Sequence, residues 1–398
     1  MARQHVVVLS RITPFHSSGG MQAVAWDIAR SLAEDGLRVT FLTTEIEGRE
    51  ASFTEEGVEV EGLPGVPAGK YSRRWWEASL DYFLNHLVDS VDAVLSVSAA
   101  GYGLLPARQT LPGVRFVMQA HGTAIGEIVS KWRIRRPKAL ATSAYNALWL
   151  LRDLATYRKF DCVVCVGEAV YRSLRRAPTS WFLPRDRVTV IPNGVDTHVF
   201  SPDTEARGRA RCELGWAQDH RVIVTVSRLH PQKGVEHALN GFAAYSARDP
   251  RARYLIVGGG SQEAELRDLS IELGVGEKVT FTGNVRRAKV ADYLRAADAF
   301  LFTNTREEGL PLNLLEAAAV GLPLVVSESL LGLASSCSVA RGVAPRDVGS
   351  IASALESMLS THKGPIRPEP RLPREYSLEY CAQRYRQVLL SEPCVTVS

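Results

Sequence analysis

The chain has 398 residues, of which 45% are hydrophobic and 23% charged, and its formal net charge is +4. This composition excludes an intrinsically disordered chain, and the length exceeds the roughly 250–300 residues at which single domains usually stop growing. We therefore expect two folded domains, each with its own core.

The first half predicts a parallel α/β sheet. A strand-like run is followed by a loop that ends in Gly19 and Gly20, an amphipathic helix and a second strand, which is the pattern of a β-α-β unit. The expected strands lie at residues 5–10, 37–45, 91–98, 114–122 and 160–167, and the first helix at 21–36.

The second half repeats this alternation more regularly, which argues for a second doubly wound sheet. A helix is expected from about Val235. The expected strands lie at residues 221–229, 253–260, 278–285, 297–304 and 322–327.

The turn-rich segment "IPNGVDTHVFSPD" marks the expected domain boundary. A Pro-rich break precedes a last helix, which we expect to cross back onto the first domain. The chain is thus divided into residues 1–195, residues 196–375 and a terminal helical segment, 376–398.

Open parallel sheets bind ligands beyond the carboxyl ends of their strands, so the loops there carry the candidate residues. Gly19 and Gly20 precede a helix, whose free N–H groups and dipole suit an anion. Arg228 and Lys233 belong to one loop and could reach the same phosphate group. In both cases the alternative is an ordinary solvated loop.

Three glutamates and one histidine add to these candidates. Glu307 and Glu308 follow an expected strand, and Glu316 lies in the first turns of the next helix among apolar residues. Carboxylates are seldom buried without partners, and a pair of ribose hydroxyls is one natural partner. The alternative is a first-turn glutamate favoured by the helix dipole. His121 follows another strand and fits either a site or a hydrogen-bonded strand end.

Several cofactor classes lack their motifs. The GxG at Gly258 and Gly260 has Glu263 where a dinucleotide fingerprint needs its third glycine. No GxxxxGK[ST] occurs, and no Asp-x-Asp that would chelate a metal–diphosphate. Cys162 and Cys165 fit buried thiols better than a zinc site, because no second pair of ligands lies near. We therefore expect no metal.

Two basic segments with tryptophan, 73–76 and 131–138, suit an anionic membrane surface or a lipid-linked acceptor. The alternative is a solvated loop with its aromatic rings packed inward. The basic residues form no long stripe along the sequence, so nucleic-acid binding is not expected. Neither a signal segment nor a membrane span is evident, since the longest apolar stretch, 309–326, contains proline, asparagine and glutamate. We expect a cytoplasmic protein, with contact to the inner face of the membrane left open.

Five motifs follow one another from about residue 190 to 330: "IPNGVD", "VSRLHPQKG", "VGGGSQEAEL", "VTFTGNV" and "EEGLPLNLLEAAAVGLPLVVS". In this order they resemble the retaining glycosyltransferases of family 4, also called glycosyl transferases group 1, which have the GT-B fold. The resemblance covers nearly the whole chain. It implies two Rossmann-like doubly wound domains that face each other across a cleft, with the acceptor on residues 1–195 and a nucleotide sugar on residues 196–375.

The resemblance also assigns roles. Glu308 and Glu316 match the two glutamates of the family, the first beside the donor sugar and the second on the nucleotide ribose. Arg228 and Lys233 match the basic pair on the diphosphate, and His121 matches a histidine near the reaction centre. Backbone contacts to the base, sugar and phosphates are implied at Gly19, Gly20, Gly283, Val285, Leu310, Pro311 and Leu312.

One departure concerns the donor sugar. Leu310 and Pro311 stand where the family often has Phe-Gly, and proline removes a backbone donor. The contacts to the sugar are therefore expected to differ from those usual in the family.

The expected activity is transfer of a hexosyl unit from a nucleoside diphosphate sugar to an acceptor hydroxyl, with retention and without a metal or another cofactor. A UDP-sugar is the favoured donor. The acceptor is either a lipid-linked or cell-envelope glycan or a small-molecule glycoside, and no oligomeric state is predicted. The alternatives are an epimerase or phosphorylase of the same fold, or an inactive protein that binds nucleotide sugars.

Overall fold

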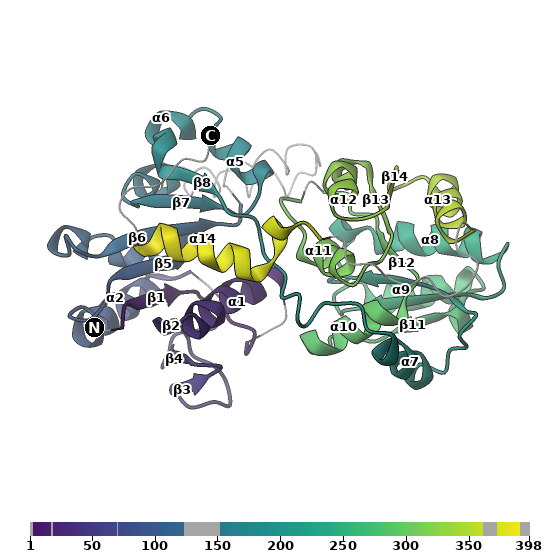
Figure 1. Ribbon diagram of the computed structural model, residues 1–398, viewed down its shortest axis with the longest axis horizontal. Helices are drawn as coiled ribbons and strands as arrows, with labels where there is room; N and C mark the ends of the chain where they lie inside the picture. Colours follow the sequence, from purple (N-terminus) through teal and green to yellow (C-terminus); the bar gives the residue numbers. More distant parts are fainter. Residues whose placement is uncertain are drawn as a thin grey trace. The chain divides into compact units, whose positions relative to one another are not determined.

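The computed structural model describes residues 3–16, 19–69, 71–122, 152–306, 308–360 and 372–390. The chain divides into two compact units, Met1–Gly194 together with Leu378–Ser398, and Val195–Ser377 (Figure 1). Each unit is a mainly parallel sheet with helices on its faces, so the predicted fold class, two Rossmann-like α/β domains, is confirmed.

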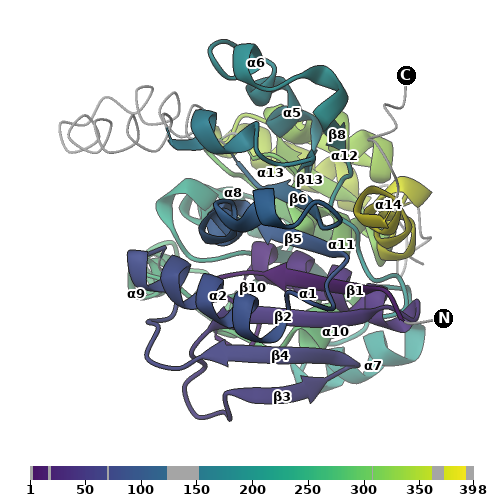
Figure 2. The ribbon, with the colours of Figure 1, turned by 90° about the vertical axis from the view of Figure 1, so that its left-hand side faces the viewer.

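The first unit contains an eight-stranded sheet in the order β3-β4-β2-β1-β5-β6-β7-β8, in which only β3 is antiparallel to its neighbour (Figure 2). The Val-rich strands of its centre are fully buried, as both faces are covered. The strands are β1 (His5–Leu9), β2 (Arg38–Thr44), β3 (Ser52–Glu55), β4 (Val58–Leu63), β5 (Ala93–Val97), β6 (Arg115–Ala120), β7 (Cys162–Cys165) and β8 (Val188–Val190).

Helices α1 (Gly20–Glu34) and α14 (Leu378–Leu390) pack side by side on one face of this sheet (Figures 1 and 2). On the other face, α2 (Arg73–His86) and α5 (Glu168–Leu174) contribute to a separate apolar core. The last helix begins at Leu378, two residues after the start of the predicted terminal segment 376–398, and belongs to the first unit. The short helix α6 (Thr179–Phe182) lies beyond the β8 edge.

The second unit contains a six-stranded, wholly parallel sheet in the order β11-β10-β9-β12-β13-β14. The chain winds outward from β9 to β11 and then returns to the other side of β9, so a topological switch point lies between β9 and β12. The strands are β9 (Arg221–Val226), β10 (Ala252–Val257), β11 (Val279–Phe281), β12 (Ala299–Phe302), β13 (Leu324–Ser327) and β14 (Ala340–Val343).

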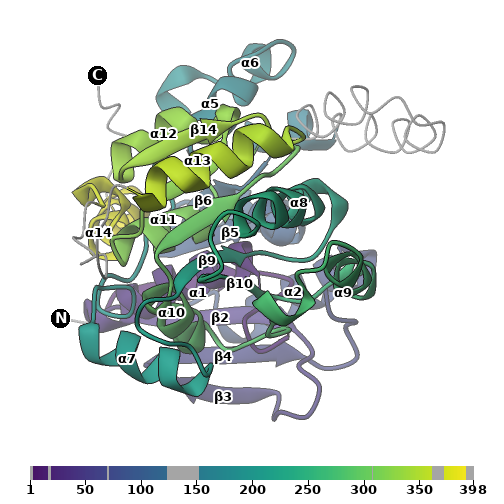
Figure 3. The same ribbon diagram turned by 90° about the vertical axis from the view of Figure 1, so that its right-hand side faces the viewer.

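Helix α8 lies between α13 and α9 on one face of this sheet (Figure 3), and their apolar residues form one core with β9, β10 and β12. The return from β11 to β12 runs through α10, which contacts β9, β10 and α7. The helices are α7 (Thr204–Glu213), α8 (Val235–Ser246), α9 (Glu263–Glu272), α10 (Arg287–Ala296), α11 (Leu312–Ala319), α12 (Leu331–Cys337) and α13 (Val348–Ser360).

The "RRWW" segment, residues 73–76, is the first turn of α2 rather than a loop. The Ser72 hydroxyl accepts the Trp75 N–H at 3.1 Å and caps the helix. Trp75 is fully buried and donates its indole N–H to the Ala100 carbonyl, and Trp76 donates to the Ala99 carbonyl. The tryptophans therefore pack inward, as the alternative expectation held. The segment 131–138 lies outside the described residues.

Candidate active site

Two loops meet at the switch point of the second unit. The loop after β9 turns at Gly234, whose φ of 66° is left-handed, and a Cβ there would lie 2.0 Å from the Thr303 carbonyl oxygen. The Thr303 hydroxyl in turn donates to the Gly234 carbonyl at 2.7 Å, and the Thr305 N–H to the Gln232 carbonyl at 3.0 Å. These bonds hold the loop after β9 against the loop after β12.

This contact brings together two residues predicted for the site. Lys233 ends a short 3-10 turn, and its Nζ lies 2.5 Å from Oε1 of Glu308. Both side chains are mostly buried, with 18% and 19% of their surface exposed. The Lys233 ammonium also lies 5.4 Å from the centre of the Phe302 ring. A charge held in this way meets an incoming anion without first being ordered.

The second predicted glutamate is a buried carboxylate. Glu316 lies in the second turn of α11 and is 6% exposed. Arg287, at the start of α10, donates its Nε–H to Oε1 of Glu316 at 3.1 Å. The Arg287 guanidinium also covers the Phe200 ring, 5.2 Å from its centre. The cation offsets the cost of burying the carboxylate.

The N-terminus of α11 directly follows Glu308. Leu310 is half-buried, while Pro311 and Leu312 are buried. Pro311 occupies the N-cap position of α11 and makes no side-chain hydrogen bond to the helix. Asn313 anchors this end through its Nδ2, which donates to the Val226 carbonyl at 2.6 Å. The first N–H groups of a helix have no intrahelical acceptor and attract anions.

The loops after β10 and β11 are joined at their start. The Gly258 N–H donates to the Gly283 carbonyl at 3.0 Å, and the Gly259 N–H to Oδ1 of Asn284 at the same distance. Gly283 has a left-handed φ of 65°, and Val285 is half-buried. Gly283 and Val285, whose backbone is expected to contact the nucleotide base, therefore lie in a loop that is held by hydrogen bonds.

Arg228 differs from the other predicted cations. It follows β9 and is exposed, and among the described residues its guanidinium has no ion pair. An unpaired guanidinium keeps all of its N–H donors available for a phosphate group.

The remaining predicted residues belong to the first unit. Gly19 caps α1 and Gly20 begins it, next to the switch point between β1 and β5. The preceding loop is tied down by His16, whose Nδ1 accepts the Thr13 N–H at 3.0 Å and whose Nε2 lies 3.0 Å from the Glu45 carbonyl. This histidine gave no signal in the sequence, where it reads as one polar loop residue.

His121 directly follows β6. Its Nε2 lies 2.8 Å from Oε1 of Gln119, and the Gln119 amide donates to the Tyr385 hydroxyl at 2.8 Å. Burial lowers the pKa of His121 to about 4, so the imidazole is neutral near pH 7. A neutral histidine in this position can orient or polarise a hydroxyl, but it carries no positive charge.

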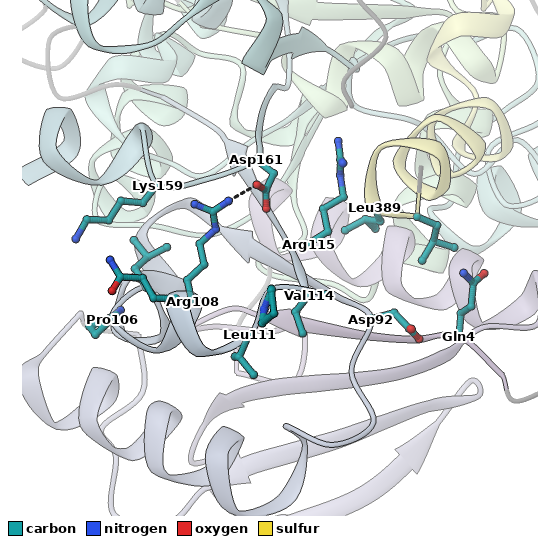
Figure 4. A pocket seen from close by; sticks show the side chains of 15 residues that line it. Gln4, Asp92, Pro106, Arg108, Leu111, Val114, Arg115, Lys159, Asp161 and Leu389 are labelled. Carbon is teal, nitrogen blue, oxygen red and sulfur yellow. Dashed lines mark hydrogen bonds and ion pairs between the residues drawn. The ribbon is translucent and has the colours of Figure 1, made fainter. Parts of the chain in front are cut away.

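A hollow of about 770 Å³ lies in the first unit, away from these residues (Figure 4). Asp92, Arg115 and Asp161 line it at the amino ends of β5, β6 and β7. Arg108 is already paired with Asp161. Since ligands of such sheets bind at the carboxyl ends, this hollow does not compete with the site described above.

The described part of the chain lacks two further features. Within it, no three histidine, cysteine, aspartate or glutamate side chains are grouped so that they could hold a metal ion. Nor does it contain a helix with the length and apolar character needed to cross a membrane.

Sequence reasoning missed Arg287 and Asn304. Arg287 is 29 positions from Glu316, and only the α10 crossover beneath the sheet brings them together. Asn304 is 2% exposed and follows β12; its Nδ2 donates to the Arg306 carbonyl at 2.5 Å. Within the described structure its Oδ1 has no partner. A polar residue at a strand end was the only signal that could have indicated it.

Two family models match the chain, one in each half. Residues 18–199 match Glycosyltransferase Family 4, and residues 207–365 match Glycosyl transferases group 1. A sucrose-phosphate synthase from Thermosynechococcus elongatus has a similar fold, with a TM-score of 0.74 over 97% of this chain and 99% of that one, at 21% identity.

Two curated relatives are similar in sequence. One is a GDP-mannose-dependent alpha-(1-6)-phosphatidylinositol monomannoside mannosyltransferase of Mycolicibacterium smegmatis, 36% identical over 52% of this chain and 55% of its own length. The other, a D-inositol 3-phosphate glycosyltransferase of Stackebrandtia nassauensis, is 29% identical over 78% of this chain and 71% of its own length. The chain thus spans little more than half of the first relative. With both family models matched in order and the fold shared, the chain belongs to the family 4 glycosyltransferases, glycosyl transferases group 1.

Proposed function

We propose that the protein transfers a hexosyl unit from a nucleoside diphosphate sugar to an acceptor hydroxyl, with retention and without a metal. The observation that carries this proposal is the meeting of Lys233, Glu308 and the N-terminus of α11 at one switch point, with Glu316 one turn further along the helix. These are the groups that a diphosphate, a sugar and a ribose need.

In this proposal the leaving diphosphate is stabilised by charge. Lys233, Arg228 and the first N–H groups of α11 face the negative charge that grows on the diphosphate as the glycosidic bond breaks. The Glu308 carboxylate lies beside the sugar, and Glu316 accepts hydrogen bonds from the ribose hydroxyls. The departing phosphate takes the acceptor proton on the same face, so no protein base is assigned. Gly19, Gly20 and His121 remain predicted contacts to the diphosphate and the sugar.

The identity of the donor base is the most specific part of the proposal. A UDP-sugar is the prediction from the resemblance, whereas the name of the M. smegmatis relative specifies GDP-mannose. That name also specifies a lipid acceptor, which favours a lipid-linked glycan over a small-molecule glycoside. We propose that the acceptor is a carbohydrate hydroxyl in either case.

A thermal-shift screen of UDP-, GDP-, ADP- and TDP-sugars tests the donor assignment. A donor at about 100 times its Kd should stabilise the protein by roughly 2.7 kcal/mol. The shift should disappear in Glu316→Gln, which keeps the shape of the side chain. It should persist in Glu356→Gln, which alters an exposed glutamate of α13 that pairs with Arg248. If no nucleotide sugar shifts the folded wild type, the proposal fails.

A further inference from the structure

Two large aromatic side chains of the first unit are exposed on its surface. Trp181 is 76% exposed and Phe182 44%, and both lie in α6, beyond the β8 edge of the sheet. Tryptophan seldom stays this exposed, since burying it is worth more than burying almost any other side chain. The same short segment buries Thr179, two residues before Trp181, and Leu183, directly after Phe182, so only the aromatic pair is turned outward.

The segment is held in this shape by hydrogen bonds. The Arg175 guanidinium donates to the Leu183 carbonyl at 2.8 Å and links the end of α5 to the end of α6. The Leu183 N–H donates to the Thr179 carbonyl, and the Ser180 N–H to the Arg176 carbonyl. The aromatic pair is therefore presented by a fixed turn rather than by a free loop.

The surroundings of the pair are strongly basic. Residues 172–187 contain five arginines and one acid, Asp186, which gives a net charge of +4 over sixteen residues. Arg176 and Arg185 are exposed on either side of the pair. These sixteen residues therefore carry a net charge as large as that of the whole chain, which is also +4.

We infer that the aromatic–arginine surface of α5 and α6, defined by Arg176, Trp181, Phe182 and Arg185, docks the protein on an anionic lipid bilayer. Tryptophan and phenylalanine insert at the level of the headgroups, and arginines beside them meet the lipid phosphates. Charge complementarity selects this occupant, since a second copy of the chain would bring five arginines against five arginines. The inference rests on the first unit alone and does not depend on the donor assignment.

Co-sedimentation of the full chain with sucrose-loaded vesicles tests the inference. Wild type should bind vesicles with about one third phosphatidylglycerol in phosphatidylcholine far better than phosphatidylcholine alone, and salt should weaken the binding. Trp181→Ser/Phe182→Ser should lower the partition coefficient at least about tenfold. Arg176→Gln/Arg185→Gln should lower it roughly 30-fold, as each arginine near an anionic surface is worth about fivefold.

Two controls match these variants. Ile271→Ser removes an apolar side chain that is 71% exposed in the second unit, and Arg73→Gln/Arg74→Gln removes two exposed arginines of α2. Both should bind as wild type does. Circular dichroism and the melting temperature should be unchanged in all four variants, because the altered side chains are exposed.

The inference is overturned if wild type does not prefer anionic vesicles, or if the α6 variants bind as tightly as wild type. It is also overturned if the α2 variant loses binding and the α6 variants do not. Light scattering tests the alternative that a second copy of the chain binds here. If wild type is a dimer that binds no vesicles, and Trp181→Ser/Phe182→Ser is a monomer, the surface serves self-association.

Discussion

At the scale of single residues, the charges of the second unit meet in pairs. Lys233 lies against Glu308 and Arg287 against Glu316. Each cation is therefore already held in place beside a carboxylate. A diphosphate would compete with Glu308 for Lys233, whereas a ribose diol needs only the outer lone pairs of Glu316. In the proposed site, the two pairs would therefore serve different parts of one ligand.

Replacement of Lys233 should affect the reaction more than the fold. Lys233→Met should lower kcat by about 10²–10³, which corresponds to the roughly 3–4 kcal/mol lost with one oxyanion donor. Steady-state release of nucleoside diphosphate from the donor measures it. Lys289→Met, which removes an exposed ammonium that pairs with Glu213, should leave kcat unchanged. A change confined to KM would mean that Lys233 binds ground and transition states equally.

His121 should make stability depend on pH. Its pKa is about 4 in the folded chain and ordinarily 6.5, so the unfolded chain binds the proton more readily. The stability that this group contributes is complete above pH 6.5 and is lost as the pH falls from 6.5 to about 4, by at most about 3 kcal/mol. Urea unfolding of wild type and His121→Gln across this range measures it. Parallel curves for the two proteins would contradict the shift.

At the scale of elements, the turn between β9 and α8 sets the site. Gly234→Ala should destabilise the protein more than Gly274→Ala, although both positions have a left-handed φ. A Cβ at residue 274 meets no atom within 4 Å, whereas one at residue 234 would lie 2.0 Å from the Thr303 carbonyl oxygen. We expect about 1 kcal/mol for the control and at least 2 kcal/mol more for Gly234→Ala. Equal losses in urea unfolding would show that the loop simply moves aside.

Helix α7 is fixed to the second sheet by a buried ionic cluster. The Asp298 carboxylate pairs with Arg207 at 2.5 Å and Arg211 at 2.7 Å, and it also accepts the Val222 N–H at 2.8 Å. Asp298→Ala leaves two buried guanidinium groups without their anion and should cost about 3–5 kcal/mol of stability. Asp292→Ala is the control. Its carboxylate pairs with Arg295 but is 36% exposed, so its loss should cost under about 1 kcal/mol. A small loss at Asp298 in urea unfolding would mean that water replaces the carboxylate.

Elements with strong apolar runs were predictable from the sequence, and those fixed by tertiary contacts were not. The central strands, α1, α11 and α14 begin within about three residues of their predicted positions, since buried parallel strands and amphipathic helices have clear patterns. The β3–β4 hairpin and the edge strands β8 and β14 were missed because short or half-exposed strands lack such a pattern. No helix was predicted at α2. Residues 73–76 indicated either a membrane-binding segment or a solvated loop, because the buried Trp75 follows two arginines.

At the scale of the whole molecule, the two units differ in how many of the proposed site residues they contain. The second unit holds most of the residues proposed for the donor, on loops tied to one switch point, and its family motifs are dense. The first unit contains the remaining predicted contacts, Gly19, Gly20 and His121, together with the aromatic–arginine surface. The pairing of Arg287 with Glu316 depends on the order of the strands in the second unit. That order carries α10 across the sheet and gives Glu316 its cationic partner.

The central claim, that Glu316 holds the ribose of a nucleotide donor, is tested most directly by calorimetric titration. Wild type and Glu316→Gln are each titrated with the nucleoside diphosphate that gives the largest thermal shift and with its 2′,3′-dideoxy analogue. Wild type should bind the parent nucleotide roughly 10–100-fold more tightly than the analogue, since hydrogen bonds to a carboxylate are worth about 1.5–3 kcal/mol. Glu316→Gln should bind both with nearly equal affinity. If wild type does not distinguish the two, or if the variant retains the full preference, the ribose does not bind at Glu316 and the proposed donor site is wrong.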